Sequence, residues 1–191
     1  MQRRNFLALL SVAAPWRAAL AQGFPSKPIR IVVPNAPGGA ADITARAVGE
    51  HMARTLGQPV IIENKPGAGG VVAGQAVATA VPDGTTLLLI SSGTAVSQAL
   101  FKSLPFDTLK SFAPVAPLAT FDLVIVSKEG GAFKTLGDLI EHARKNPGQV
   151  NIGTPNIGTT QHLAAELFKS AAGLDFQVVP FTATPDVVTA I

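Results

Sequence analysis

The chain has 191 residues, of which 47% are hydrophobic and 14% are charged. This balance is typical of a globular protein and excludes an extended disordered chain. The sequence contains no cysteine, which excludes disulfide bonds, thiol catalysis and thiolate metal sites. The length suffices for one ordinary domain or two small ones.

Residues 1–21 have the pattern of an export signal. A basic start (Arg3, Arg4) precedes an apolar run over 6–14, and Ala-Leu-Ala over 19–21 forms a small-residue cleavage site. The apolar run is too short to span a bilayer. The paired arginines followed by Asn-Phe-Leu also resemble a twin-arginine signal. We therefore expect a periplasmic protein, and the alternative is a short basic helix that belongs to the fold.

Removal of this signal changes the charge of the protein. The full chain has 15 Lys and Arg and 12 Asp and Glu, and the signal contains three arginines and no acid, which leaves 12 of each sign. A mature chain without net charge has no general electrostatic reason to bind nucleic acid or anionic lipid. We expect no nucleic-acid partner.

Strands and helices alternate along the rest of the chain, which predicts an α/β fold with a largely parallel sheet. Apolar runs bounded by turn residues predict the strands, and apolar residues at spacings of three and four predict the helices. In chain order the predicted elements are a strand over 29–33, a helix over 40–56, a strand over 59–63, a helix over 71–80, a strand over 85–91, a short helix within 91–101, an irregular stretch over 104–119, a strand over 123–127, a helix from 135 to Pro147, a strand over 150–154, a helix that ends at Gly173, a strand over 176–181 and a helix from Asp186.

Three of the predicted helices carry specific signals. On the first helix five apolar residues share one face: Ala41, Ala45, Val48, Met52 and Leu56. Gly57 is expected to end that helix. Thr135 and Asp138 have the spacing of a capping box, which predicts a helix start. Before Gly173, four apolar residues are expected to face a core: Leu163, Leu167, Phe168 and Ala171.

Three loops follow predicted strands where an α/β sheet binds its ligands, beyond the carboxyl ends of the strands. They cover 34–41, 91–95 and 154–160, are rich in Gly, Ser, Thr, Asn and Pro, and contain no Lys or Arg. Backbone N–H groups at a helix start carry the positive end of the helix dipole, so they bind anions without a charged side chain. Gly38 and Gly39 allow close approach of the backbone to a ligand. Hydroxyl groups that can donate to a carboxylate belong to Ser91, Ser92, Thr94, Thr154, Thr159 and Thr160.

Two such loops facing each other would hold both ends of a small dicarboxylate, and the alternative is that each loop is an ordinary turn. Asp42 has three candidate roles: it favours the first helical turn, it fixes the loop through backbone N–H groups, or it accepts from a ligand through water. His162 lies on a first helical turn and could donate to a carboxylate, or it is structural. His51 and His142 are expected at the surface, and the scattered histidines predict no metal site.

Enzyme motifs are missing from the sequence. In "GAGGVVAG" (67–74), Val72 stands where a dinucleotide fingerprint needs its third glycine. The sequence has no phosphate-binding loop with G-x-x-x-x-G-K-[ST] and no G-x-S-x-G. We therefore expect no catalysis and no cofactor, and an exported hydrolase would require His162 against Ser91 or Ser92.

Several stretches together resemble the periplasmic receptors of the tripartite tricarboxylate transporters, also called Bug solute-binding proteins. The resemblance runs from Pro25 to Pro185. The stretches are "PNAPGGAADITARAV", "LGQPVIIENKPGAGG", "VATAVPDGTTLLL", "SFAPVAPLA", "IGTPNIGTTQHLAAELFKSAAGLD" and "VVPF".

The resemblance implies a periplasmic-binding-protein-like α/β fold with two domains and a hinged cleft that closes on a small organic acid. We expect the first domain over 22–119 and a partial second domain over 120–191. The implied ligands are di- or tricarboxylates, acidic amino acids or aromatic acids, and the implied partners are the two membrane subunits of the transporter. The protein is expected to be a monomer.

The resemblance places ligand contacts in the loop from Pro37 to Asp42 and in the loop from Thr154 to His162, where backbone amides, hydroxyls and water dominate. The candidate ligand-binding residues are Asn35, Pro37, Gly38, Gly39, Ala40, Asp42, Ser92, Thr94, Thr154, Asn156, Gly158, Thr159, Thr160 and His162.

The chain departs from the family pattern in three places. Pro155 lies in a loop where the family often has serines, and "PFTA" over 180–183 replaces a common P-Y-K-G. The third departure is at Ile191, because family sequences continue well beyond the matching position. We expect a C-terminally truncated receptor, and the alternative function is a receptor fragment that binds nothing.

Overall fold

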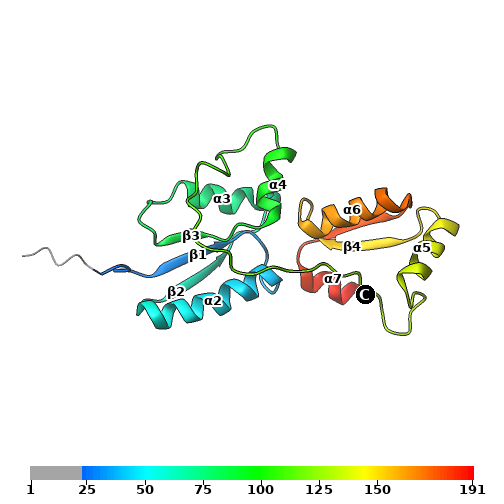
Figure 1. The fold of residues 1–191 in the computed structure, drawn as a ribbon, viewed down its shortest axis with the longest axis horizontal. Coiled ribbons are helices and arrows are strands. Elements are labelled where there is room, and N and C mark those ends of the chain that lie inside the picture. The colour runs from blue at the N-terminus through cyan, green and yellow to red at the C-terminus, as the bar shows by residue number, and fades with distance from the viewer. Residues whose placement is uncertain (1–22) are drawn as a thin grey trace, which may run out of the picture.

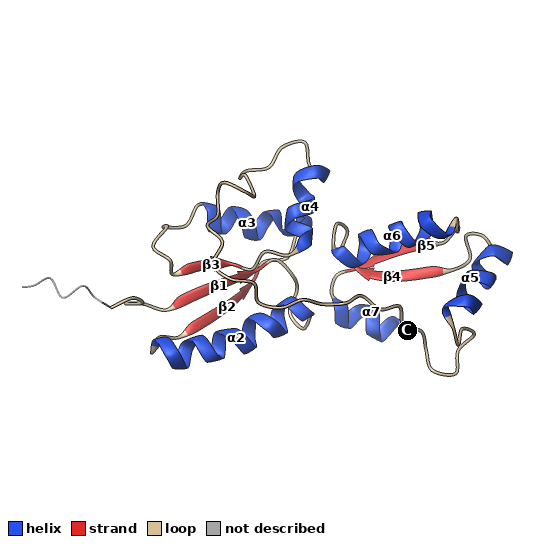
Figure 2. Cartoon of the chain, in the orientation of Figure 1, coloured by secondary structure: helices blue, strands red, loops and turns tan. Residues whose placement is uncertain are grey.

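The computed structural model of the chain describes residues 23–191. The predicted export signal lies outside the described residues. Two α/β lobes lie side by side (Figure 1), each with parallel strands and helices around them (Figure 2). We call the part from β1 to α4 the N-terminal lobe and the part from α5 to α7 the C-terminal lobe. This arrangement confirms the predicted α/β class.

The two lobes contain the following elements. The N-terminal lobe comprises β1 (Ile29–Val33), α2 (Ala40–Leu56), β2 (Val60–Asn64), the 3-10 turn η1 (Ala68–Gly70), α3 (Val71–Ala78), β3 (Thr86–Leu88) and α4 (Ser92–Leu100). The C-terminal lobe comprises α5 (Leu136–Lys145), β4 (Asn151–Pro155), α6 (Thr160–Ala172), β5 (Gln177–Phe181) and α7 (Thr184–Ala190). In this part of the chain, 23–191, no helix is both long enough and apolar enough to cross a membrane.

The N-terminal lobe is built around β1, which lies between β2 and β3 in a parallel sheet. In the sheet register, Ile31 pairs with Ile62 on one side and with Leu87 on the other. Helices α2 and α3 cover opposite faces of this sheet (Figure 1). The strand is therefore buried from both sides along most of its length, which explains why four of its five residues are apolar and only Arg30 is exposed.

Helix α2 packs closely on β2 because of a glycine. A Cβ atom at Gly49 would lie 3.1 Å from Val60 Cγ1 and 3.2 Å from Ile62 Cδ1. The helix ends at Gly57 as predicted, in a left-handed conformation with φ of 66°. Its apolar face contributes Ala45 to the core beside the strand residues.

The C-terminal lobe has a separate core: α6 and α7 pack on the β4–β5 pair, and α5 adds apolar residues to the core. The buried residues of this core are Leu139, Ala143, Val150, Leu174 and Phe176. The predicted capping box at the start of α5 is confirmed, since Asp138 N donates to Thr135 Oγ1 at 3.1 Å and Thr135 N donates to Asp138 Oδ2 at 2.9 Å.

Three predictions about the elements were wrong. The predicted strand over 123–127 is not a strand: the segment is extended without ladder partners, and Val124 is 80% exposed. Its β-branched sequence favours a strand, but a strand also needs a neighbour to pair with. The strand predicted over 85–91 is limited to Thr86–Leu88, where it pairs with β1. Leu167 and Ala171 were expected to face a core, but both are exposed, Leu167 to 69%.

A long irregular segment joins the two lobes. Residues 104–119 form no helix or strand, as their prolines predict. From 113 to 130 every side chain is exposed. Within the described residues the chain passes from one lobe to the other once, through this segment (Figure 1).

Candidate functional site

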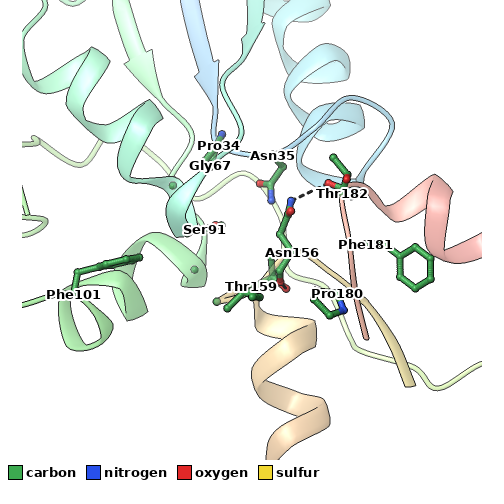
Figure 3. A pocket seen from close by; sticks show the side chains of 15 residues that line it. Pro34, Asn35, Gly67, Ser91, Phe101, Asn156, Thr159, Pro180, Phe181 and Thr182 are labelled. Atoms are coloured by element: carbon green, nitrogen blue, oxygen red, sulfur yellow. Dashed lines mark hydrogen bonds between the residues drawn. The ribbon is translucent and has the colours of Figure 1, made fainter. Parts of the chain in front are cut away.

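A cavity of about 420 Å³ lies between the two lobes, at the carboxyl ends of β1, β2, β4 and β5 (Figure 3). The N-terminal lobe lines it with Pro34, Asn35, Gly67, Gly69, Gly70, Ser91, Gly93 and Phe101. The C-terminal lobe lines it with Asn156, Ile157, Gly158, Thr159, Pro180, Phe181 and Thr182. None of these residues is charged, so an anion in the cavity would be held by neutral donors.

The N-termini of α4 and α6 face each other beside the cavity. The Ser92 and Thr160 hydroxyls, from the first turns of these two helices, form a hydrogen bond between the lobes. Next to this pair, a Cβ atom at Gly93 would lie 3.2 Å from Gly158 O. Both helix starts therefore point their free N–H groups toward the region between the lobes.

The loop from Asn35 to Gly39 meets the start of α7 at a second contact between the lobes. A Cβ atom at Gly38 would lie 3.1 Å from Pro185 Cγ, and one at Gly39 would lie 3.4 Å from Thr184 Oγ1. Gly38 also has a positive φ of 82°. The two glycines thus allow close contact with α7, a part of the C-terminal lobe.

Asp42 is buried at the start of α2, with 3% of its surface exposed, and it fixes the loop that precedes the helix. Its Oδ2 accepts from Gly38 N and from Arg46 Nε, both at 3.0 Å. Its Oδ1 accepts from Asn64 Nδ2 at 2.9 Å, and the same Nδ2 donates to Asn35 O at 3.0 Å. Of the roles considered for Asp42, the structure therefore shows the loop-fixing one and the helix-start one.

The electrostatics of Asp42 follow from these contacts. The hydrogen bond from Arg46 lowers the pKa of the Asp42 carboxyl below its ordinary value, and the Gly38 and Asn64 hydrogen bonds lower it further against the opposing effect of burial. The carboxylate occupies the N-terminal end of α2, so the chain itself supplies the anion at this helix start. The helices whose N-caps line the cavity are α3, α4 and α6, with Gly70, Ser91 and Thr159 respectively.

The loop between β4 and α6 is held in shape by its own hydrogen bonds. Asn156 has a positive φ of 35°, its backbone N donates to Phe181 O at 2.7 Å, and its Nδ2 donates to Thr182 O at 2.9 Å (Figure 3). Thr159 Oγ1 lies 2.5 Å from Pro155 O and accepts from His162 N at 3.3 Å. The Thr159 hydroxyl therefore caps α6.

Four predicted site residues carry a buried polar atom without a hydrogen-bond partner in the described structure. These atoms are Asn35 Oδ1, Thr94 Oγ1, Thr154 Oγ1 and His162 Nδ1. A buried polar atom costs about 1–3 kcal/mol when unpaired, and ligand atoms or structural water commonly supply the partner. Asn35 lines the cavity, whereas Thr94 and Thr154 are buried at 0% and 3% exposure and do not.

The structure divides the predicted site residues into groups. Those that line the cavity are Asn35, Asn156, Gly158 and Thr159. Those at contacts between the lobes are Gly38, Gly39, Ser92 and Thr160. Those that do not line the cavity and make no such contact are Pro37, Ala40, Asp42, Thr94, Thr154 and His162.

Sequence reasoning missed the turn at Gly67, Gly69 and Gly70, which lines the cavity. This glycine-rich stretch failed the dinucleotide fingerprint and contributed to the family resemblance, but no ligand contact was assigned to it. The position of the turn after the predicted strand was a usable signal. Strand β2 is parallel to β1, so the carboxyl ends of both strands lie at the same edge of the sheet, where ligands bind.

The condition set for an exported hydrolase is not met in the described part of the chain. The structure shows no hydrogen bond between His162 and either Ser91 or Ser92, and Ser92 bonds to Thr160 instead. Over residues 23–191 no three His, Cys, Asp or Glu side chains gather as metal ligands.

Comparisons with known proteins agree with this arrangement. Residues 44–191 match the profile of a family described as the tripartite tricarboxylate transporter family receptor. A UPF0065 protein of Bordetella pertussis is 45% identical over 184 residues, which cover 95% of this chain and 55% of that protein. The protein BugT of the same organism is 35% identical over 92% of this chain and 54% of its own length.

Solved structures of periplasmic binding proteins are similar to this chain in fold. The periplasmic binding protein BugD is 30% identical with a TM-score of 0.75 over 87% of this chain and 56% of that one. MatC from Rhodopseudomonas palustris, solved with bound malate, is 34% identical with a TM-score of 0.73 over 87% of this chain and 57% of that one. An R. palustris protein solved with adipate is 26% identical with a TM-score of 0.76 over 87% of this chain and 56% of its own.

These matches confirm the predicted periplasmic-binding-protein-like fold. The chain spans about half the length of the curated relatives it matches, 55% for the B. pertussis protein. Its relatives are described as receptors and periplasmic binding proteins. The chain belongs to the receptor family of the tripartite tricarboxylate transporters.

Proposed function

We propose that the chain is a periplasmic receptor that captures a small carboxylate in the cavity between its lobes and delivers it to the membrane subunits of a tripartite tricarboxylate transporter. The observation that carries this proposal is the uncharged cavity of about 420 Å³ between the lobes. Its volume lies within the range of about 300–1,000 Å³ that small-molecule sites occupy.

Neutral groups suit a carboxylate at this position. The Ser91 N-cap of α4 and the Thr159 N-cap of α6 both line the cavity, so the free N–H groups of two helix starts lie beside it. These groups bind anions through the helix dipole and through hydrogen bonds. The neighbouring carboxamides of Asn35 and Asn156, one from each lobe, supply further hydrogen bonds (Figure 3).

The relatives support the same class of ligand. MatC was solved with malate and another R. palustris protein with adipate, both of them dicarboxylates. Of the candidate residues, the proposed ligand contacts are those that line the cavity: Asn35, Asn156, Gly158 and Thr159. The proposed export route is the signal over 1–21. The receptor is proposed to act as a monomer.

The test is thermal unfolding of the chain, followed by circular dichroism, against seven acids: citrate, malate, succinate, adipate, aspartate, glutamate and benzoate. Circular dichroism is suitable because the only tryptophan, Trp16, lies in the predicted signal and the chain has no tyrosine. An acid at about 100 times its dissociation constant should stabilise the fold by about 2.7 kcal/mol.

Two asparagine variants localise the binding. Asn156→Ala removes a cavity-lining carboxamide, and Asn146→Ala removes one that donates to His142 O at 3.0 Å, away from the cavity. We expect Asn156→Ala to abolish the stabilisation by acid and Asn146→Ala to retain it. A cooperative transition that no acid raises would refute the carboxylate ligands, and equal effects of the two variants would refute the site. A chain with no cooperative transition would support the alternative of a fragment without binding function.

A further inference from the structure

The turn from Gly67 to Gly70 forms a wall of the cavity that none of the three predicted loops contains. Gly67, Gly69 and Gly70 all line the cavity. Their φ angles are positive, at 139°, 63° and 97°, a backbone region that residues with a side chain rarely adopt. The sequence therefore fixes an unusual backbone shape at the cavity surface.

The missing side chains of this turn would point toward the protein. A Cβ atom would lie 2.5 Å from Ser97 Oγ if built at Gly69, and 2.7 Å from Thr94 Oγ1 if built at Gly70. Thr94 and Ser97 are both fully buried. At Gly67 the Cβ atom would lie 3.0 Å from Val72 Cγ2. The surface that the turn presents to the cavity is therefore backbone.

Ser97 holds this turn against α4. Its hydroxyl lies 2.8 Å from Gly69 O and 2.9 Å from Gly93 O. Both Gly69 and Gly93 line the cavity, whereas Ser97 itself does not. A single buried hydroxyl thus bridges two segments of the cavity wall from behind.

We propose that the Gly67–Gly70 turn is a further ligand-contacting loop, which presents backbone N–H groups to the oxygen atoms of a bound acid, and that Ser97 is the residue that positions it. This inference rests on the proposed function, since it assigns a further element of the same site. The close contacts to Ser97 and Thr94 leave no room for a residue other than glycine, so the turn sets the depth of the cavity on this side.

The first test compares two hydroxyl variants by isothermal titration calorimetry, with the acid of the seven-acid panel that binds the wild-type chain most tightly. Ser97→Ala removes the bridge, whereas Thr79→Ala removes an exposed hydroxyl that donates to the backbone of its own helix at 2.9 Å from Gln75 O. We expect Ser97→Ala to raise the dissociation constant about tenfold, and Thr79→Ala to leave it within twofold. The measurement is made at a temperature where both variants are folded, so a loss of stability alone does not change the result.

The second test uses a matched pair of glycines. Gly57 has a φ of 66°, close to the 63° of Gly69, and a Cβ atom there would meet no atom within 4 Å. Both Gly57→Ala and Gly69→Ala strain the backbone, but only Gly69→Ala is expected to weaken binding about tenfold or more. In the double variant Gly69→Ala/Ser97→Ala, the new methyl group no longer meets the Ser97 hydroxyl. Comparing its dissociation constant with those of the two single variants separates the steric effect at Gly69 from the loss of the Ser97 hydrogen bonds.

The outcomes distinguish this inference from the proposed function. If none of the seven acids binds the wild-type chain, the proposed function fails and the inference fails with it. If an acid binds and Ser97→Ala and Gly69→Ala both keep dissociation constants within twofold of wild type, the inference is overturned and the proposed function stands. If Gly69→Ala does not fold, Ser97→Ala decides alone.

Discussion

Replacement of Asp42 by alanine removes the acceptor that holds the β1–α2 loop on its helix. Gly38 N and one N–H of Asn64 lose their partner, and both hydrogen bonds are partly buried. A donor left without its acceptor in such a place costs about 1–3 kcal/mol, so two half-buried donors cost about 3 kcal/mol together. The Arg46 side chain is 53% exposed, and water replaces its contact.

The loss of about 3 kcal/mol corresponds to a fall in Tm of about 6–12 °C for a chain of this length. The measurement is thermal unfolding followed by circular dichroism. The matched control is Glu50→Ala, which removes another carboxylate on α2 that pairs with Arg54 where both side chains are about two-thirds exposed, at 65% and 66%. We expect Glu50→Ala to lower Tm by about 2 °C or less. If Asp42→Ala lowers Tm no more than Glu50→Ala, the loop-fixing role of Asp42 is wrong.

Three further predictions concern pH, a helix cap and a close contact. The pKa of Asp42 is lowered chiefly by Arg46, so its contribution to stability is complete above about pH 4, the ordinary value, and is lost as the pH falls through the lower folded pKa. Tm measured from pH 2 to 6 should therefore depend less on pH for Asp42→Ala than for wild type, and parallel curves would contradict this. Thr135→Ala removes the N-cap of α5 and should lower the free energy of unfolding by about 1 kcal/mol in urea titrations. At Gly74 a Cβ atom would lie 2.3 Å from Phe106 Cζ, so Gly74→Ala should destabilise the fold by about 1–3 kcal/mol despite its better helix propensity. A more stable Gly74→Ala chain in the same titration would refute that contact.

Local sequence signals predicted those parts of the fold that local interactions determine. Helix α2 was predicted to its ends because its apolar spacing and Gly57 both lie within the segment. The cap of α5 was predicted because Thr135 and Asp138 are three residues apart. The segment over 123–127 was predicted wrongly, because its residues favour a strand while a strand depends on a distant partner that local sequence does not specify.

The same distinction applies to the candidate site. The positions of the loops after β1 and β4 followed from the alternation of strands and helices, and Asn35 and Asn156 do line the cavity. The direction in which each side chain points could not be predicted, since it depends on neighbours far along the chain. Thr94 looked like a ligand hydroxyl and is buried behind Gly70. Thr159 looked like another, and its hydroxyl caps α6.

The described chain connects the two lobes through one segment only. Closure, meaning the approach of one lobe to the other around the cavity, is therefore an association between two parts of the same molecule. Residues 113–130 form an exposed connection without helix or strand. The lobes meet at the Ser92–Thr160 pair and at the contact of Gly38 with Pro185. The connection therefore sets the effective concentration of one lobe at the surface of the other, which is in the millimolar range for short flexible linkers.

This effective concentration enters the apparent affinity for ligand, because the apparent dissociation constant is the intrinsic one divided by the closed fraction. Cleavage of the chain within 113–130 would turn closure into a reaction between two molecules. Ligand binding would then depend on protein concentration, although every residue that lines the cavity would be unchanged.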